Sequence, residues 1–154
     1  MEYSHLIRQA EKSDLEELVA LGSRFFRASP HSELMAVLDN DIRDGLSNVL
    51  DGGVVFVSEL DGKLVGMCAG AMTTLWFAKS IPVACEFAWW VDQEHRKGAS
   101  GLKLLMAFEA WATRQGAKFI CMTDLMTDGK RSDNKDLFLK LGYRAMERAM
   151  VREV

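Results

Sequence analysis

A short basic segment with glycines is the part of this sequence whose residue types point most directly to chemistry. It stands before apolar residues that recur at helical spacing and reads Arg96-Lys97-Gly98-Ala99-Ser100-Gly101. Backbone amides at a helix start have no partner within the helix, and the helix dipole adds partial positive charge there. Small residues let a phosphate reach such amides, and Arg96 and Lys97 add cationic charge. The segment predicts a pyrophosphate-binding turn, although a tight connection without a ligand would use the same small residues.

One acidic residue stands out in the apolar stretch that precedes this turn. Glu86 is the only charged residue within residues 83–91. Burial raises the pKa of a carboxyl group towards the range in which it can act as a general base. Glu86 is therefore a candidate base. A carboxylate at a solvated sheet edge, or one paired with a nearby basic residue, is the alternative.

Composition narrows the kind of protein. The formal net charge is −3, with 19 Lys and Arg residues against 22 Asp and Glu residues. A nucleic-acid-binding protein usually carries a basic stripe, so no nucleic-acid partner is expected. Three separated cysteines without a Cys-x-x-Cys pair, and three separated histidines, predict neither a disulfide framework nor a metal site. With no apolar run of about 18 residues and no signal peptide, we expect no membrane partner and a cytoplasmic location.

Hydrophobic periodicity indicates the elements that must position these residues. Helices are expected over residues 14–27, 32–50, 101–115 and 133–141, the first starting at a capping box formed by Ser13 and Glu16. Strands are expected over residues 5–8, 54–59, 64–72, 83–91 and 119–123, with one or two more in 143–150. Residues 73–82 are predicted to form a loop around Trp76 and Phe77. This order predicts one α+β domain over residues 1–154.

The turn and its flanks carry a resemblance to a known family. Residues 91–102 resemble the acetyl-CoA signature of the GNAT (Gcn5-related N-acetyltransferase) superfamily, whose core is Arg/Gln-x-x-Gly-x-Gly/Ala. Arg96 and Gly101 match its two ends, and Ala99 replaces the middle glycine. The segments at 7–15, 55–66 and 137–143 are similar to the family's first strand and helix, its second and third strands, and its late helix.

The resemblance implies a fold and a reaction. The fold would be a mixed, mostly antiparallel sheet of six to seven strands flanked by about four helices. The reaction would be direct transfer of an acetyl group from acetyl-CoA, in a ternary complex, to a primary amine of a small molecule or peptide. Glu86 would be the base, and no metal is needed. CoA would contact the backbone of Trp90 and Val91 and the turn formed by Arg96, Lys97, Gly98, Ala99, Ser100 and Gly101. Ser132 and Asn134, at the start of the late helix, could also contact CoA, with helix capping as the alternative use of these residues.

Other positions leave alternatives open. The family's late helix often carries a tyrosine that protonates the leaving thiolate, but the matching residue here is Phe138. Tyr143 is expected to be structural. Trp89 and Trp90 point to opposite faces of a strand, so one packs under a helix and the other either packs or lines the acceptor cleft. Candidates for the acceptor pocket lie between the first two helices: Phe26, His31 and Glu33.

Two other kinds of protein remain compatible with the sequence. One is a non-catalytic domain of the same fold that binds CoA or another protein. The other is an interaction protein in which the glycine-containing turn is only a connection. A homodimer is also an expectation, with the apolar loop at Trp76 and Phe77 as a contact.

Overall fold

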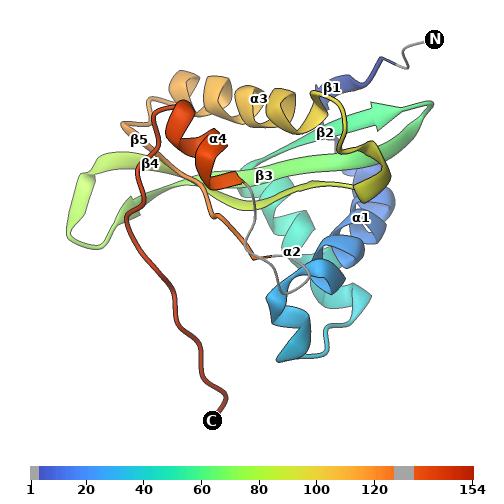
Figure 1. The fold of residues 1–154 in the computed structure, drawn as a ribbon, viewed down its shortest axis with the longest axis horizontal. Coiled ribbons are helices and arrows are strands. Elements are labelled where there is room, and N and C mark those ends of the chain that lie inside the picture. The colour runs from blue at the N-terminus through green and yellow to red at the C-terminus, as the bar shows by residue number, and fades with distance from the viewer. Residues whose placement is uncertain (1–3, 127–133) are drawn as a thin grey trace.

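The computed structural model describes residues 4–126 and 134–154 (Figure 1). These residues form five strands and four α-helices in the order β1, α1, α2, β2, β3, β4, α3, β5, α4. The strands are β1 Leu6–Gln9, β2 Val54–Leu60, β3 Lys63–Leu75, β4 Ala78–Val91 and β5 Phe119–Cys121. The helices are α1 Leu15–Ala28, α2 Asp39–Gly52, α3 Ser100–Arg114 and α4 Asn134–Lys140. Short 3-10 turns lie at Lys12–Asp14, Pro30–Glu33 and Gln93–His95.

The strands form one sheet in the order β1-β2-β3-β4-β5. All neighbours are antiparallel except β4 and β5, which are parallel. The mixed, mostly antiparallel sheet is therefore confirmed. The loop predicted over 73–82 is largely wrong, because both strands continue through it and only Trp76 and Phe77 form the turn. Thr73 pairs with Val83 there, and β-branched residues favour such pairing.

The expected number of six to seven strands is also wrong for the described residues, which contain five. The strands predicted in 143–150 are absent, because this stretch runs as an extended segment that pairs with no strand among the described residues (Figure 1). Gly142 ends the α4 turn with a φ of 90°, a conformation that glycine adopts at little cost. Apolar alternation can predict a strand, but a strand forms only where a partner supplies hydrogen bonds.

Two helix starts differ from the prediction. The helix expected from residue 32 begins at Asp39, after the separate turn at Pro30–Glu33. Its first turn is closed by Asp41, whose carboxylate accepts a hydrogen bond from the amide of Leu38 at 3.1 Å. The expected capping box of Ser13 and Glu16 is replaced by one that begins two residues earlier, where the carboxylate of Asp14 accepts a hydrogen bond from the amide of Glu11 at 2.7 Å.

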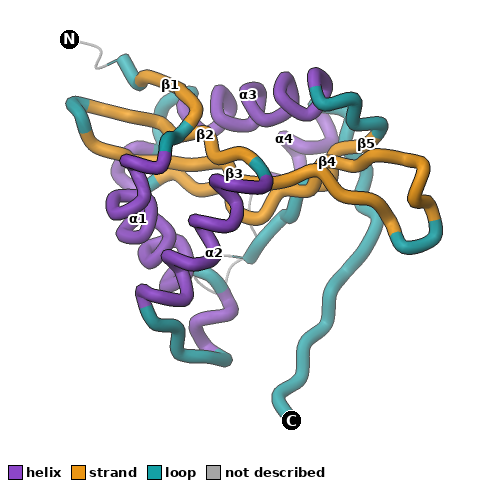
Figure 2. Tube along the Cα trace, turned by 180° about the vertical axis from the view of Figure 1, so that it is seen from behind, coloured by secondary structure: helices purple, strands orange, loops and turns teal. Residues whose placement is uncertain are grey.

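Helices cover both faces of the sheet, as Figures 1 and 2 show: α3 lies on one face, and α1 and α2 lie on the other. The core on the α3 face contains Leu104 and Phe108, and the core on the opposite face contains Leu18 and Leu21. The close approach of α3 depends on Gly70, since a Cβ at this residue would lie 2.7 Å from the Phe108 ring. This packing holds the start of α3 beside the end of β4.

Candidate active site

The strands β4 and β5 separate part of the way along the sheet. Their parallel pairing joins Val83 with Phe119 and ends at Cys85 with Cys121. Beyond this point β4 continues to Val91, paired with β3 on one side only. Within the part of the chain that the structure describes, no strand lies against the other side of residues 87–91. This fork leaves a length of β4 backbone available to an extended ligand.

The end of β4 shows which of its backbone groups are open. The amide of Asp92 donates to the carbonyl of Val65 at 2.8 Å. Because hydrogen-bonded and non-hydrogen-bonded pairs alternate along antiparallel strands, the amide and carbonyl of the preceding residue, Val91, point away from β3. The carbonyl accepts a hydrogen bond from Nε of Arg96 at 2.7 Å. The amide of Val91 therefore faces the open side of the fork.

Glu86 lies where the two strands part. Its side chain is buried, with 9% of the residue exposed, and its Oε2 accepts a hydrogen bond from the amide of Thr123 at 2.9 Å. Burial raises the pKa of Glu86 from 4.5 to about 7, against the opposing effect of the hydrogen bond from Thr123. A carboxyl group with such a pKa can gain and lose a proton near neutral pH.

A β-bulge decides which face Glu86 occupies. Ala69 pairs with Ala88, but Gly70 pairs with Glu86, so Phe87 is an extra residue in β4. Simple alternation would put Glu86 on the same face as Trp90. The bulge reverses this, and Glu86 shares the α3 face with Val91, which belongs to the core cluster on that side.

The start of α3 provides a cradle of unpaired donors. The residue before the helix is Ala99, whose side chain supplies no cap, and the first turn holds no acidic residue. Within the described residues, the backbone amides of residues 97–102 donate no hydrogen bond. Ser100 is 2% exposed, and its Oγ is a buried polar atom without a partner. Buried polar groups are rarely left unpaired, so this arrangement fits an anionic group that would complete it.

Arg96 and Lys97 differ in placement. The guanidinium of Arg96 stacks on the Trp90 ring, 4.4 Å from its centroid, while its Nε holds the Val91 carbonyl. Arg96 thus closes the end of β4. Lys97 and Gly98 instead line an open cavity of about 390 Å³, with His5 and Glu94 also in its wall. No atom lies within 4 Å of a Cβ built on Gly98, so this residue is open to approach.

The two tryptophans are both packed, on opposite faces. Trp89 packs against Phe138 of α4, with ring centroids 5.5 Å apart, and donates a hydrogen bond to the carbonyl of Gly101 at 3.0 Å. This bond ties β4 to the first turn of α3. Trp90 is buried against Phe25 of α1, with ring centroids 6.0 Å apart. Its side chain also borders a cavity of about 390 Å³ beside α1, so it both packs and lines a hollow.

Sequence reasoning missed the ion pair that holds α1 at this site. Arg24 donates two hydrogen bonds of 2.9 Å to the carboxylate of Asp92, which also accepts from Nε1 of Trp90 at 3.0 Å. Asp92 is buried. Its position directly after an apolar run was a visible signal, but nothing local indicates a partner 68 residues away.

Aromatic side chains on and after α4 pack against each other beside β4. Phe138 is buried and contacts Tyr143, with ring centroids 5.3 Å apart. The hydroxyl of Tyr143 donates to Oε1 of Glu109 on α3 at 2.7 Å, and burial and this bond raise its pKa far above its ordinary value. Asn134 is half-buried at the first position of α4. Ser132 lies outside the described residues.

The expected acceptor residues lie elsewhere on the α1 side. Phe26 is half-buried near the end of α1, and His31 and Glu33 are exposed in the turn that follows. None of the contacts among described residues joins these side chains to Glu86. No group of three or more His, Cys, Asp or Glu side chains in residues 4–126 and 134–154 is arranged to hold a metal. No helix in these ranges is both long and apolar enough to span a membrane.

The geometry is that of a known family of proteins. The model of the acetyltransferase (GNAT) family matches residues 5–143, so the chain belongs to this family. No curated protein matches the chain significantly. The chain is similar to the aminoglycoside N-acetyltransferase AAC(6')-Iy in complex with CoA, with a TM-score of 0.75, 18% identity and coverage of 98% of this chain and 95% of that one.

Two further solved structures share the fold. An acetyltransferase of Trypanosoma brucei gives a TM-score of 0.72 at 19% identity, covering 98% of this chain and 100% of that one. A predicted acetyltransferase of Clostridium acetobutylicum, solved with acetyl-CoA, gives a TM-score of 0.74 at 14% identity, covering 97% and 96%. The α+β GNAT fold is therefore confirmed, and the resemblance seen in the turn extends over nearly the whole chain.

Proposed function

We propose that this chain is an acetyl-CoA-dependent N-acetyltransferase acting on a primary amine. The observation that carries the proposal is the start of α3, where the backbone amides of residues 97–102 and the buried hydroxyl of Ser100 have no hydrogen-bond partner among the described residues. The amides at 97–102 and Ser100 would hold the pyrophosphate of CoA, and the open edge of β4 up to Val91 would hold its pantetheine arm. Asn134 on α4 is a further proposed contact to CoA.

The fork then becomes the place of transfer. Bound acetyl-CoA supplies the acyl group as a thioester. The chain holds donor and acceptor together in a ternary complex, an effect worth up to ~7–11 kcal/mol of the barrier. The amide of Val91, which faces the open side, would donate a hydrogen bond to the thioester carbonyl.

Glu86 is the proposed base. It would accept the proton of the acceptor ammonium directly or through a water molecule, which leaves a neutral amine to attack. Its position at the fork and its pKa of about 7 support this role. A purely structural role, holding Thr123 beside β4, is the competing interpretation of the same hydrogen bond.

No side chain is proposed as the acid that protonates the leaving thiolate. Phe138 has no hydroxyl, and the hydroxyl of Tyr143 already donates a hydrogen bond to Oε1 of Glu109. The raised pKa of Tyr143 also makes it a weak proton donor. Water is therefore the proposed proton source.

Acetyl-CoA binding tests the proposal. Titration should raise the melting temperature, since a ligand at 100 times its Kd stabilises the folded state by about 2.7 kcal/mol. Gly98→Glu should remove the shift by placing a carboxylate in the cradle. Gly98→Ala is the matched control, because its Cβ meets no atom within 4 Å. The absence of any shift with the unaltered chain at millimolar acetyl-CoA would contradict the proposal.

The alternative is a non-catalytic CoA-binding or protein-interaction domain, favoured by Phe138 in place of a tyrosine. Binding of acetyl-CoA without release of CoA across a broad amine panel would support it. The panel should include small amines, peptides and aminoglycosides, since one similar structure of AAC(6')-Iy holds the bisubstrate analog CoA-S-monomethyl-acetylneamine. The proposed enzyme would act in the cytoplasm, with no membrane or nucleic-acid partner, as one domain over 1–154 and as a homodimer.

A further inference from the structure

The cavity beside α1 is lined by guanidinium groups that the fold uses only in part. Its volume is about 390 Å³, and Arg24, Arg27 and Arg96 all lie in its wall. Arg24 and Arg27 belong to α1, whereas Arg96 lies in the turn between β4 and α3. The ring of Trp90, on which Arg96 stacks, borders the same cavity. Only folding brings these three basic residues together.

Each of the three arginines keeps donors without a partner. Arg24 bonds to Asp92 through Nε and Nη2, which leaves Nη1. Arg27 bonds only to Ser23 of its own helix, through Nε and Nη2. Arg96 uses Nε for a carbonyl of β4, and neither of its Nη atoms donates a hydrogen bond to a described residue. Because a guanidinium has five N–H donors and stays charged, these groups suit an anionic ligand.

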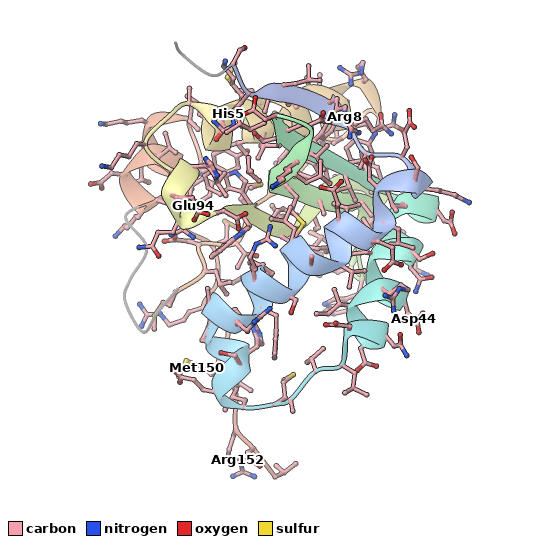
Figure 3. The ribbon with its side chains drawn as sticks, turned by 90° about the vertical axis from the view of Figure 1, so that its right-hand side faces the viewer. His5, Arg8, Asp44, Glu94, Met150 and Arg152 are labelled. Atoms are coloured by element: carbon pink, nitrogen blue, oxygen red, sulfur yellow. The ribbon has the colours of Figure 1, made fainter. Side chains whose placement is uncertain are left out.

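The balance of charge in the cavity wall also favours an anion. Three guanidinium groups stand against two carboxylates, those of Asp92 and Glu94. Asp92 is already neutralised by Arg24, and in the part of the chain that the structure describes no carboxylate pairs with Arg27 or Arg96. Glu94 is the opposing charge, and Figure 3 shows it on the turn that follows β4, beside α1. The wall is thus basic although the chain has a net charge of −3.

The strand β4 connects this cavity with the fork. Trp90 lies in the cavity wall, Glu86 lies where the fork begins, and the bulge residue Phe87 stands between them. At ~3.3 Å per residue, the separation along the strand is roughly 10–13 Å. No described strand lies against the open side of β4 over this length. An extended molecule held in the cavity at one end therefore reaches Glu86 with the other.

We propose that Arg27 and Arg96 bind an anionic group of the acceptor, a carboxylate or a phosphate, while its amine lies at Glu86. Arg24 stays paired with Asp92 and adds positive charge to the cavity. The acceptor class is then an amine that carries an anion at its far end. A polyamine is disfavoured, because its second positive charge meets the same guanidinium groups. This inference rests on the proposed N-acetyltransferase function and names the acceptor of that site.

A pair of amines that differ only in charge measures the preference. In 8-aminooctanoate the amine and the carboxylate are roughly 10 Å apart when the chain is extended, and 8-aminooctanamide has the same length without the negative charge. In calorimetry with the unaltered chain, the Kd of the carboxylate should be about tenfold lower than that of the amide, as expected for hydrogen bonds to a charged group. Saturating CoA should leave both values within about threefold. The dication 1,8-diaminooctane should bind more weakly than the amide.

Three variants separate charge from packing. Arg27→Gln should reduce the preference for the carboxylate to about threefold or less and leave the Kd of the amide unchanged. Glu94→Gln should act in the opposite direction and strengthen carboxylate binding about threefold, since it removes the opposing charge. Arg114→Gln, exposed at the end of α3, is the matched control and should change neither value. Unchanged circular dichroism and melting temperatures verify that the variants fold.

Equal Kd values for the carboxylate and the amide, or an undiminished preference in Arg27→Gln, would overturn the proposal. So would carboxylate binding that saturating CoA abolishes, because the arginines would then hold the phosphates of CoA. Inorganic phosphate that binds as tightly as 8-aminooctanoate would assign the arginines to a free anion and equally overturn it.

A failure of the proposed function gives a different result. The chain would then keep its preference for the carboxylate over the amide, and Arg27→Gln would still reduce it. No amine would be acetylated, however, and acetyl-CoA would not raise the melting temperature. Acetylation of 8-aminooctanoate and 8-aminooctanamide with equal kcat/KM would show the converse, an active enzyme whose acceptor needs no anion.

Discussion

The Oε2 atom of Glu86 lies 2.9 Å from the backbone nitrogen of Thr123, at the point where β4 and β5 cease to pair. The carboxylate thus accepts a hydrogen bond where the backbone pairing between β4 and β5 has ended, and this bond holds Thr123 beside β4 at the start of the fork. One residue both builds the fork and places a titratable group inside it.

Burial of Glu86 makes stability depend on pH. Its pKa is about 7 in the folded chain against 4.5 ordinarily, so the folded state binds the proton more tightly. The contribution of this protonation to the free energy of unfolding is fully present below pH 4.5. It is lost as the pH rises through 7, which lowers the free energy of unfolding by about 3 kcal/mol. Glu86→Gln keeps a hydrogen-bond acceptor and should lose this dependence. Urea unfolding from pH 4.5 to 8.5 measures it, and parallel profiles for the two proteins would contradict the burial argument.

The same substitution tests the proposed base. Glu86→Gln should lower kcat by about 10²–10⁴-fold and remove a rise in rate centred near pH 7. The Kd of acetyl-CoA should be unchanged within about threefold in calorimetry, because the substitution leaves the α3 cradle intact. Full activity of the variant would leave Glu86 with its structural role only.

Ser100→Ala should have opposite effects on the stability of the ligand-free chain and on its affinity for acetyl-CoA. Removing a buried hydroxyl without a partner should stabilise the ligand-free chain by about 1 kcal/mol. Affinity for acetyl-CoA should fall about tenfold, since a hydrogen bond to a charged group contributes about 1.5–3 kcal/mol. Urea unfolding and calorimetry measure the two effects. Thr113→Ala, at the other end of α3, is the control and should leave affinity unchanged.

Asp92→Ala should destabilise the fold by about 2–3 kcal/mol, because it leaves Arg24 and the Trp90 N–H without an acceptor. The value lies at the low end for a buried ion pair because Arg24 is partly exposed. Asp92→Asn retains a hydrogen-bond acceptor and should lower the free energy of unfolding by less than Asp92→Ala does. Lys12→Ala breaks an exposed pair with Asp51 and should have no measurable effect in the same unfolding experiment. Equal stability of Asp92→Ala and the unaltered chain would contradict the role given to this pair.

Gly70→Ala should lower the free energy of unfolding by at least about 3 kcal/mol, since its Cβ would overlap the Cys85 carbonyl and the Phe108 ring. Gly45→Ala should raise the free energy of unfolding by up to about 1 kcal/mol. Gly45 lies on the exposed side of α2, and no atom lies within 4 Å of the new Cβ. Denaturation midpoints compare the two. A tolerated Gly70→Ala would mean that α3 can move off the sheet.

Tyr143→Phe should lower stability by about 1 kcal/mol through loss of the bond to Glu109 and leave kcat within about threefold. Steady-state kinetics beside unfolding measurements check both values. A hundredfold loss of kcat would instead assign Tyr143 a part in the reaction.

Local patterns in the sequence were sufficient for much of the fold. Three of the four α-helices lie close to their predicted ranges, because the apolar face of a helix and its start depend on residues that are close in sequence. The exception is α2, where Pro30–Glu33 forms a turn of its own. The unpaired amides at the start of α3 were likewise predictable, since they follow from any helix start, and anion binding there stays a prediction.

Only the tertiary structure decided how the site is built. The bulge at Phe87 depends on pairing with β3, and it reverses the face of Glu86 that alternation alone predicts. The use of Arg96 to close β4, and the pairing of Arg24 with Asp92, depend on segments brought together by folding. The sequence predicted one or two strands in 143–150, but a strand needs a neighbouring strand, and none among the described residues pairs with this stretch. The sequence by itself determined the elements and the family, because these depend on local periodicity. Register, bulges and charge partners came only from contacts between distant residues.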